Sequence, residues 1–382
     1  MKPKVLHCLA LLLSGVLFGC VGIVRAGELP TNAEPRYLDK SLSEWIPLTE
    51  YAGSSEVDLF RRRDERACPA VLAIGTNALP WLLHWIRSEK QETAQLGIEG
   101  FGVLGPIAKP AIPELIRLAD DWRSSSVWRN AIPALAAIQK SNVPYALPFL
   151  LSAARKRSAP AEFRLQAVQS MVENRLGRKD VTSVFLLCLK DKYWAVAAKA
   201  AIGLCDLGLE PREVVPALAA CLSSRTNMPV RSPAGTVDHK PIILEGDDAV
   251  RYSAAMALVA YSSSVHSDKS KNHDYRETMR AALPVLVKAL SDEDWHVAML
   301  AAVALGYAAL EPDVAVPALV KCLNHPQPYV RDSAIRALGD FGEAARAAVP
   351  ELAKLAQSDP GGYVGGGWAS SALKKIIPQT KP

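Results

Sequence analysis

The sequence lacks the short motifs by which most enzymes can be identified. None of its seven histidines is followed by glutamate, and neither Gly-x-Ser-x-Gly nor His-Glu-x-x-His occurs. A phosphate-binding Gly-Lys-Ser/Thr sequence is also missing. We therefore expect no catalytic residue, no cofactor and no enzyme activity.

Paired cysteines and a strong net charge are missing as well. The seven cysteines include no Cys-x-x-Cys, so we expect no metal ligand set and no thiol-redox site. Residues 1–26 hold Lys2, Lys4 and Arg25 and no acidic residue, which leaves 41 basic against 39 acidic residues, a balance of +2. Because nucleic-acid binding depends on many phosphate contacts, we expect no nucleic-acid partner.

Two short patterns recur with a period of 33 residues. Leu-Pro-Val-Leu, which starts at Leu283, returns as Val-Pro-Ala-Leu at Val316 and as Val-Pro-Glu-Leu at Val349. Between the prolines lies Val-x3-Ala-x2-Ala-Leu-Gly, which starts at Val297 and again at Val330. A fixed period of this length is typical of solenoid proteins.

Each repeat can be interpreted as an antiparallel pair of helices. Proline suits the first helical turn, so Pro284, Pro317 and Pro350 are expected to open the first helix of each unit. Closely spaced alanines characterise the second helix, and Gly306 and Gly339 suit a left-handed C-cap. Since one pair cannot bury its apolar face alone, the units must stack. Alanine and leucine are abundant and strand-like alternation is absent, so we predict an all-α, right-handed α-solenoid.

These patterns resemble the HEAT-repeat proteins, in particular the short bacterial type named after phycobilisome lyases. The resemblance depends on the Pro-x-Leu openings, on Asp-x-Asp-Trp-x-Val from Asp292, and on Tyr-Val-Arg from Tyr329 before Ala-x-x-Ala-Leu-Gly. It implies an armadillo-type superhelix and a turn-and-ladder network that includes Asp191, Asp292 and Arg331. The family contains scaffolds, lyases, hydroxylases and nucleic-acid enzymes, so the resemblance implies a fold and not one activity.

The first 26 residues are typical of an export signal. Two lysines precede an apolar run, and Val24-Arg25-Ala26 fits a cleavage site. A retained membrane anchor and lipidation at Cys20 are the alternatives. We expect a periplasmic or extracellular protein, with membrane attachment only if Cys20 is lipidated or the signal is retained.

The remaining chain divides into a linker, a cap and an array. Residues 27–40 are expected to be a linker, and residues 41–75 a degenerate capping repeat that begins with the capping box of Ser41 and Glu44. About eight HEAT-like repeats follow over residues 76–378. Their first helices carry one proline each, except that Ser183 replaces it once; the other openings are Pro80, Pro113, Pro148, Pro216, Pro284, Pro317 and Pro350.

Three cysteines share one position of the repeat. Cys188, Cys221 and Cys322 each precede a leucine at the end of a first helix. Equivalent positions in adjacent units should lie roughly 10 Å apart, which is beyond disulfide reach. We interpret these cysteines as small apolar residues of the core.

Two insertions interrupt the period, at about residues 223–247 and 262–275. In solenoids such insertions form loops and often lie at the binding face. Candidate partner-binding residues in them are Arg231, His239, Lys240, His273 and Tyr275. An ordinary polar loop and a His/Asp metal site are the alternatives.

Aromatic residues recur just before the second helices. Trp128, Trp194, Trp295 and Tyr329 could form a stripe that grips an extended partner, or each ring could cap its own turn. With no catalytic motif, we favour an exported scaffold that binds an unidentified protein or peptide. An enzyme of the HEAT type, either a lyase or a metal-dependent hydroxylase, is the second reading, and a nucleic-acid-binding HEAT protein is the third.

Overall fold

Helices account for nearly all of the regular structure, as the repeats predict. The computed structural model describes residue 30 and residues 33–49, 64–139, 146–176, 179–207, 211–223, 247–267, 272–358 and 366–377. The chain divides into two units, Met1–Leu150 and Leu151–Pro382, which are described separately. Within the described ranges the only strands are β1 (Arg36–Tyr37) and β2 (Lys40–Ser41), which pair antiparallel.

In the described residues of the N-terminal unit, the hairpin is followed by helices. These are α1 (Leu42–Trp45), α2 (Ala67–Ile74), α3 (Leu79–Ile86), α4 (Gln91–Leu104), α5 (Ile112–Asp120) and α6 (Trp128–Gln139); α7 (Leu147–Arg155) runs across the division between the units. In its described residues, 3₁₀ turns occur at Ile46–Leu48, Gly75–Ala78 and Gly105–Ala111. Helix α4 packs against both α3 and α6.

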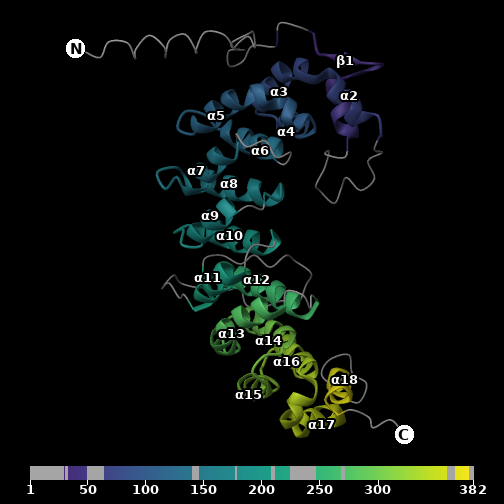
Figure 1. Cartoon of the computed structure of the whole chain (residues 1–382), viewed down its shortest axis with the longest axis vertical. Coiled ribbons are helices and arrows are strands. Elements are labelled where there is room, and N and C mark those ends of the chain that lie inside the picture. The colour runs from purple at the N-terminus through teal and green to yellow at the C-terminus, as the bar shows by residue number, and fades with distance from the viewer. Residues whose placement is uncertain are drawn as a thin grey trace, which may run out of the picture. The chain divides into compact units, whose positions relative to one another are not determined.

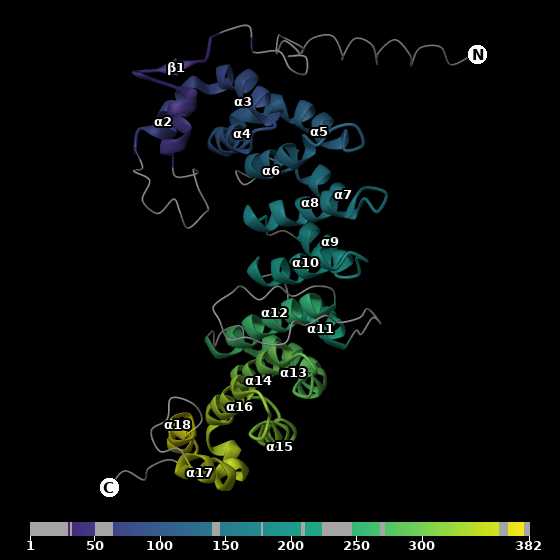
Figure 2. The ribbon, with the colours of Figure 1, turned by 180° about the vertical axis from the view of Figure 1, so that it is seen from behind.

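The C-terminal unit continues the alternation of first and second helices (Figure 1). Its elements are α8 (Ala161–Glu173), α9 (Lys179–Cys188), α10 (Trp194–Asp206), α11 (Pro211–Ser223), α12 (Asp247–Ser267), α13 (Asn272–Ala289), α14 (Trp295–Ala308), α15 (Pro312–Cys322), α16 (Pro328–Asp340), a 3₁₀ turn (Gly342–Ala348), α17 (Val349–Ser358) and α18 (Gly366–Ile376). From α8 to α16, the even-numbered second helices form one row and the odd-numbered first helices another, in both views (Figures 1 and 2). The second helices pack directly on one another from α8 to α18.

Small residues set the spacing between second helices. A Cβ added at Gly306 of α14 would lie 2.7 Å from the Cα of Ala337 in α16, closer than real Cβ atoms approach. Gly306 and Gly339 both lie inside their helices, and α14 ends instead with Ala309 in the left-handed conformation. The expectation that these glycines are C-caps is therefore wrong, because they allow two helices to approach closely.

The repeat prolines do not always lie in the first turn of their helices. Pro80, Pro113 and Pro350 are second residues of α3, α5 and α17, as expected of the first turn. Pro216, Pro284 and Pro317 lie inside α11, α13 and α15, so the expected opening is wrong for Pro284 and Pro317 as well as for Pro216. In these helices the turn before the proline is already α-helical.

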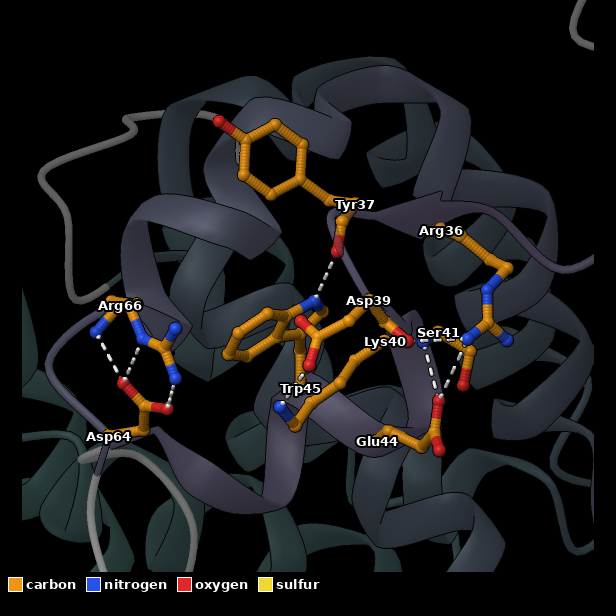
Figure 3. A network of polar contacts seen from close by, with 9 residues as sticks. All are labelled: Arg36, Tyr37, Asp39, Lys40, Ser41, Glu44, Trp45, Asp64 and Arg66. Atoms are coloured by element: carbon orange, nitrogen blue, oxygen red, sulfur yellow. Dashed lines mark hydrogen bonds and ion pairs between the residues drawn. The ribbon is translucent and has the colours of Figure 1, made fainter.

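The N-terminal cap is built around Trp45, whose side chain is fully buried. The indole Nε1 donates a hydrogen bond to the carbonyl oxygen of Tyr37 at 2.9 Å, and Lys40 Nζ lies 4.7 Å from the ring centroid (Figure 3). The N–H of Ser41 donates to Glu44 at 2.7 Å, which confirms this half of the capping box. The hairpin begins within the expected linker, so residues 36–40 belong to the cap.

The second insertion lengthens two helices. Helix α12 spans 21 residues and α13 spans 18, whereas α10 and α14 span 13 and 14. Residues 262–267 and 272–275 are therefore helical, against the expectation of a loop. Residues 224–246, nearly all of the first insertion, lie outside the described ranges, as does the proposed signal segment.

The cysteines of the described ranges are free thiols, as expected. Cys188 and Cys322 are buried, and Cys221 is partly buried. Burial raises the pKa of the Cys188 thiol to about 12, and the Asp191 carboxylate adds to the effect. This thiol stays protonated and packs as a small apolar group.

Arginine and aspartate side chains link successive pairs. Arg164 of α8 donates two hydrogen bonds to Asp191, at 2.8 and 2.7 Å, and Arg251 of α12 lies 3.3 Å from Asp292. The ladder expected for these two aspartates is confirmed. Arg331 instead donates to the carbonyl oxygens of His325 and Pro326 in its own turn.

Within the described ranges, the apolar stretch Ala67–Ile86 has the length and mean hydropathy of a membrane span, with 20 residues and a value of 1.2. It is divided into α2, a 3₁₀ turn and α3, and Gly75 adopts φ +62° at the junction. Much of its surface is buried against other helices. Length and composition alone therefore do not make it a membrane span.

We predict that Gly306→Ala lowers the free energy of unfolding by about 1–3 kcal/mol, although alanine is the better helix former. The added methyl group would meet the backbone of Ala337. Gly339→Ala is the matched control, because its nearest contact, Ala372 Cα, is 3.2 Å away. Urea unfolding followed by circular dichroism should show a larger loss for Gly306→Ala, and an equal or reversed order would contradict the close-approach role.

We predict that Arg164→Met destabilises the protein by about 3–5 kcal/mol, because Asp191 would be left as an unpaired buried charge. The exposed pair of Arg346 and Glu343 gives the control, and Arg346→Met should change the free energy by less than about 1 kcal/mol. Thermal and urea unfolding of both variants would measure this difference. Equal losses would mean that the buried pair contributes no more than a surface pair.

We predict that the pair of Arg164 and Asp191 makes the free energy of unfolding depend on pH. Burial alone would raise the pKa of Asp191, but the hydrogen bonds from Arg164 and from the Tyr193 N–H outweigh it and hold that pKa below its usual range. The ionised Asp191 therefore contributes its full stabilisation to the folded protein above the ordinary carboxyl pKa. This stabilisation is lost as the pH falls through the lowered pKa of Asp191. Arg164→Met should reduce this acid dependence.

Candidate functional site

Apolar side chains gather on the outward face of three consecutive second helices. The residues two, six and ten positions after the first valine of each second helix share one face, because they are four residues apart. On α10, α12 and α14 these positions are mostly apolar. We call the following six residues the central patch: Ile202, Tyr252, Met256, Met299, Val303 and Tyr307.

The central patch is open to solvent. Ile202 is 37% exposed, Met256 43% and Tyr307 40%, and the other three are partly exposed. Helix α12 packs against α10 on one side and α14 on the other, so the six side chains belong to one surface. Large contiguous apolar surfaces on soluble proteins usually mark interaction sites.

Charged and polar residues bound the central patch on both sides. The corresponding positions of α8 carry Leu165, Gln169 and Glu173, and those of α16 carry Asp332, Arg336 and Asp340. Arg336 lies over the Trp368 ring at 3.8 Å, and Lys375 pairs with Asp340 at 2.9 Å. The apolar surface therefore ends where the charged face of α16 begins.

A shallow groove adjoins the central patch between α8, α10 and α12. Its volume is about 290 Å³, and Leu165, Trp194 and Tyr252 supply its largest apolar walls. Lys199 also lines this groove. A groove of this size and lining can receive a large apolar side chain of a bound molecule.

The aromatic residues singled out in the sequence differ in exposure and contacts. Trp128 is only 5% exposed, with the Arg129 guanidinium 4.8 Å from its ring. Trp295 stacks on Tyr329 at 5.3 Å, and Tyr329 is 44% exposed. Trp194 lines the groove together with Ile202 and Tyr252 of the central patch.

The candidates in the insertions are placed only in part. His273 and Tyr275 lie in the first turn of α13, but their side chains are outside the described part of the structure. Arg231, His239 and Lys240 lie outside the described ranges altogether. These five residues remain predictions.

A buried polar cluster lies beneath the N-terminal ends of α12 and α14. Arg251 pairs with Asp248 and Asp292, and Asp294 holds His296 Nδ1 at 2.8 Å. Burial raises the pKa of Asp248, which the Arg251 charge only partly offsets. The His296 ring meets Tyr252 edge-on at 6.1 Å, so the cluster fixes one residue of the central patch.

The central patch is the functional feature that the sequence interpretation missed. Its signal was present: Ile202, Met256 and Tyr307 occupy outward positions of helices whose other faces are already apolar. Within the described ranges, no three His, Cys, Asp or Glu side chains converge as metal ligands. The geometry offers an adaptable apolar surface with charged borders.

Comparisons with known proteins agree with this fold. Residues 283–371 match the family model described as HEAT repeats. No curated protein sequence matches the chain. An engineered protein is similar over 88% of both chains, at 19% identity and a TM-score of 0.45.

Two natural proteins show a similar architecture. The YibA protein of Escherichia coli is similar over 84% of this chain and 99% of its own, at 16% identity and a TM-score of 0.47. Importin beta is similar over 88% of this chain at 16% identity and a TM-score of 0.50, and the match covers 46% of importin beta. Identities this low show the fold alone. The protein is thus an all-α solenoid of stacked helix pairs, with HEAT repeats over residues 283–371.

Proposed function

We propose that this protein is an exported, non-catalytic scaffold whose central patch binds a helix of another protein. The observation that carries the proposal is the row of outward apolar side chains on α10, α12 and α14, bordered by Gln169 and Glu173 of α8 and by the charged face of α16. A surface helix needs one buried face only, so apolar residues on its second face call for a partner. Methionine side chains at the centre suit a surface that adapts to its ligand.

An amphipathic helix fits this surface better than a flat partner. The groove beside Trp194 and Tyr252 offers one socket for an anchoring side chain, and Met256 and Tyr307 extend the apolar contact away from it. An amphipathic helix presents apolar anchors at three- and four-residue spacing, which matches a surface of this kind. The charged borders would limit where such a helix lies and would select its polar flanks.

Export is the second part of the proposal. It is supported by the two lysines, the apolar run and the Val24-Arg25-Ala26 sequence of residues 1–26. The near-neutral balance of the remaining chain agrees with a protein partner. The Asp-x-Asp-Trp turn from Asp292 supports assignment to the phycobilisome-lyase-like type of HEAT protein.

We predict that Met256→Lys combined with Tyr307→Lys abolishes partner binding while the protein remains folded, because both side chains are exposed. Mature protein from Gly27 would capture partners from an envelope extract, and the purified partner would then be titrated against each variant. Leu72→Lys combined with Val314→Lys is the matched control, since these exposed apolar residues lie on α2 and α15 and belong to neither the central patch nor its groove. The control should bind as the unmodified protein does.

Hydrogen exchange would locate the contact. Backbone amides of α10, α12 and α14 and of the adjoining segments should exchange more slowly when the purified partner is added. Protection confined to the first helices, or full binding by the variant with two new lysines in the central patch, would overturn the proposed surface.

We predict that the exported protein starts at Gly27, because cleavage after Ala26 fits the signal sequence. Intact-mass measurement of protein recovered from the envelope of a bacterial host would determine the first residue. A protein that starts at Cys20 with an added lipid mass would support the lipoprotein alternative. A protein that retains residues 1–26 would support the membrane anchor.

A further inference from the structure

Two successive turns of the C-terminal unit carry a concentration of positive charge. Arg155 is the last residue of α7, Lys156 and Arg157 follow it, and Lys190 and Lys192 lie between α9 and α10. We call these five residues the basic edge. The corresponding turn between α13 and α14 is acidic, with Asp292, Glu293 and Asp294, so the basic edge is a local feature.

The acidic residue among these turns does not cancel the basic edge. Asp191 accepts both of its arginine hydrogen bonds from Arg164, at 2.8 and 2.7 Å, and a further one from the Tyr193 N–H at 2.9 Å. Its charge is thus already neutralised by a residue that is not part of the edge. Asp191 therefore does not cancel the positive charges of Arg155 and Arg157, which line the same pocket.

A pocket connects the two turns. Its volume is about 160 Å³, and Ala154, Arg155, Arg157, Leu187, Cys188 and Asp191 line it. Arg155 Nε donates to the carbonyl oxygen of Leu151 at 3.1 Å, which steadies its guanidinium. Neither Arg155 nor Arg157 forms an ion pair with any residue of the described ranges.

The chemistry of the pocket favours an anion with an aliphatic stem. Arg155 and Arg157 present guanidinium groups, which match planar carboxylates in geometry as well as charge. Leu187, 52% exposed, and Ala154 supply an apolar wall. The Cys188 thiol is protonated and donates to the Ala154 carbonyl at 3.7 Å, so it offers neither a nucleophile nor a metal ligand.

We propose that this pocket binds a carboxylate side chain of an acidic peptide segment, held by Arg155 and Arg157, with its methylene groups against Leu187. The small recess suits one carboxylate better than the repeated phosphates of a nucleic acid, which need a longer row of contacts. A membrane surface of anionic lipids would favour a broad basic face, whereas Arg155 and Arg157 line one small pocket together with Leu187. This site does not depend on the central patch, because it lies at the turns of the helix pairs.

The test uses mature protein from Gly27 and a fluorescein-labelled peptide of glutamate residues, with a glutamine peptide of equal length as reference. Fluorescence anisotropy should show binding of the glutamate peptide that weakens as salt is added. Arg155→Gln combined with Arg157→Gln should weaken it by about tenfold or more, because two charge-assisted contacts are lost. Arg346→Gln combined with Lys354→Gln removes two exposed charges elsewhere and should change binding by less than about twofold.

A second variant separates a pocket from diffuse attraction. Lys190→Gln combined with Lys192→Gln removes the same charge from the basic edge but leaves the pocket lining intact. The pocket predicts a smaller loss for this variant than for the arginine variant. Equal losses, or equal binding of the glutamine peptide, would overturn the site, as would binding of phosphatidylglycerol vesicles with no binding of the glutamate peptide.

Thermal melting followed by circular dichroism would show whether the arginine variant is folded. The arginine variant should melt within a few degrees of the unmodified protein, because both side chains are on the surface. If it does not fold, Leu187→Asp tests the pocket instead, since a carboxylate fixed in the apolar wall would repel the peptide. Unchanged peptide binding by folded Leu187→Asp would overturn the proposal.

Discussion

The close approach of successive second helices is the constraint on which the rest of the structure depends. A helix pair exposes apolar surface until the next pair covers it, and the cover is tight only if the contacting residues are small. Gly306 against Ala337, and Gly339 against Ala372, show how little room remains. With second helices so close, the first helices and their turns follow at fixed intervals, and the arginine ladder can reach from Arg164 to Asp191.

Much of the fold was predictable because repeats that are adjacent in the sequence pack against each other in the structure. The helix pairs, their order and the free cysteines follow from the 33-residue period and its register. The helix ends were less predictable. Gly306 resembles a C-cap locally, but contact with α16 decides its role, and the turn before Pro284 is helical because the second insertion prolongs α13.

The candidate site was less accessible to sequence interpretation. Aromatic identity drew attention to Trp128, which is buried, and to Trp295 and Tyr329, which stack on each other. The central patch consists of ordinary residues whose significance comes from facing outward on neighbouring helices. A register comparison of all outward positions would have indicated Met256 and Tyr307, whereas the pocket at the basic edge required the Arg164 and Asp191 contact to be seen.

The borders of the central patch limit the length of the apolar surface that a bound helix could cover. Helix axes in contact are about 10 Å apart, so the distance from α10 to α14 is about 20 Å. At 1.5 Å per residue, a helix laid across them needs about 13 residues, or between three and four turns. A helix bound across the central patch, as we propose, would therefore be selected by its length as well as its chemistry, since a longer apolar face would meet Glu173 of α8 or the charged side chains of α16.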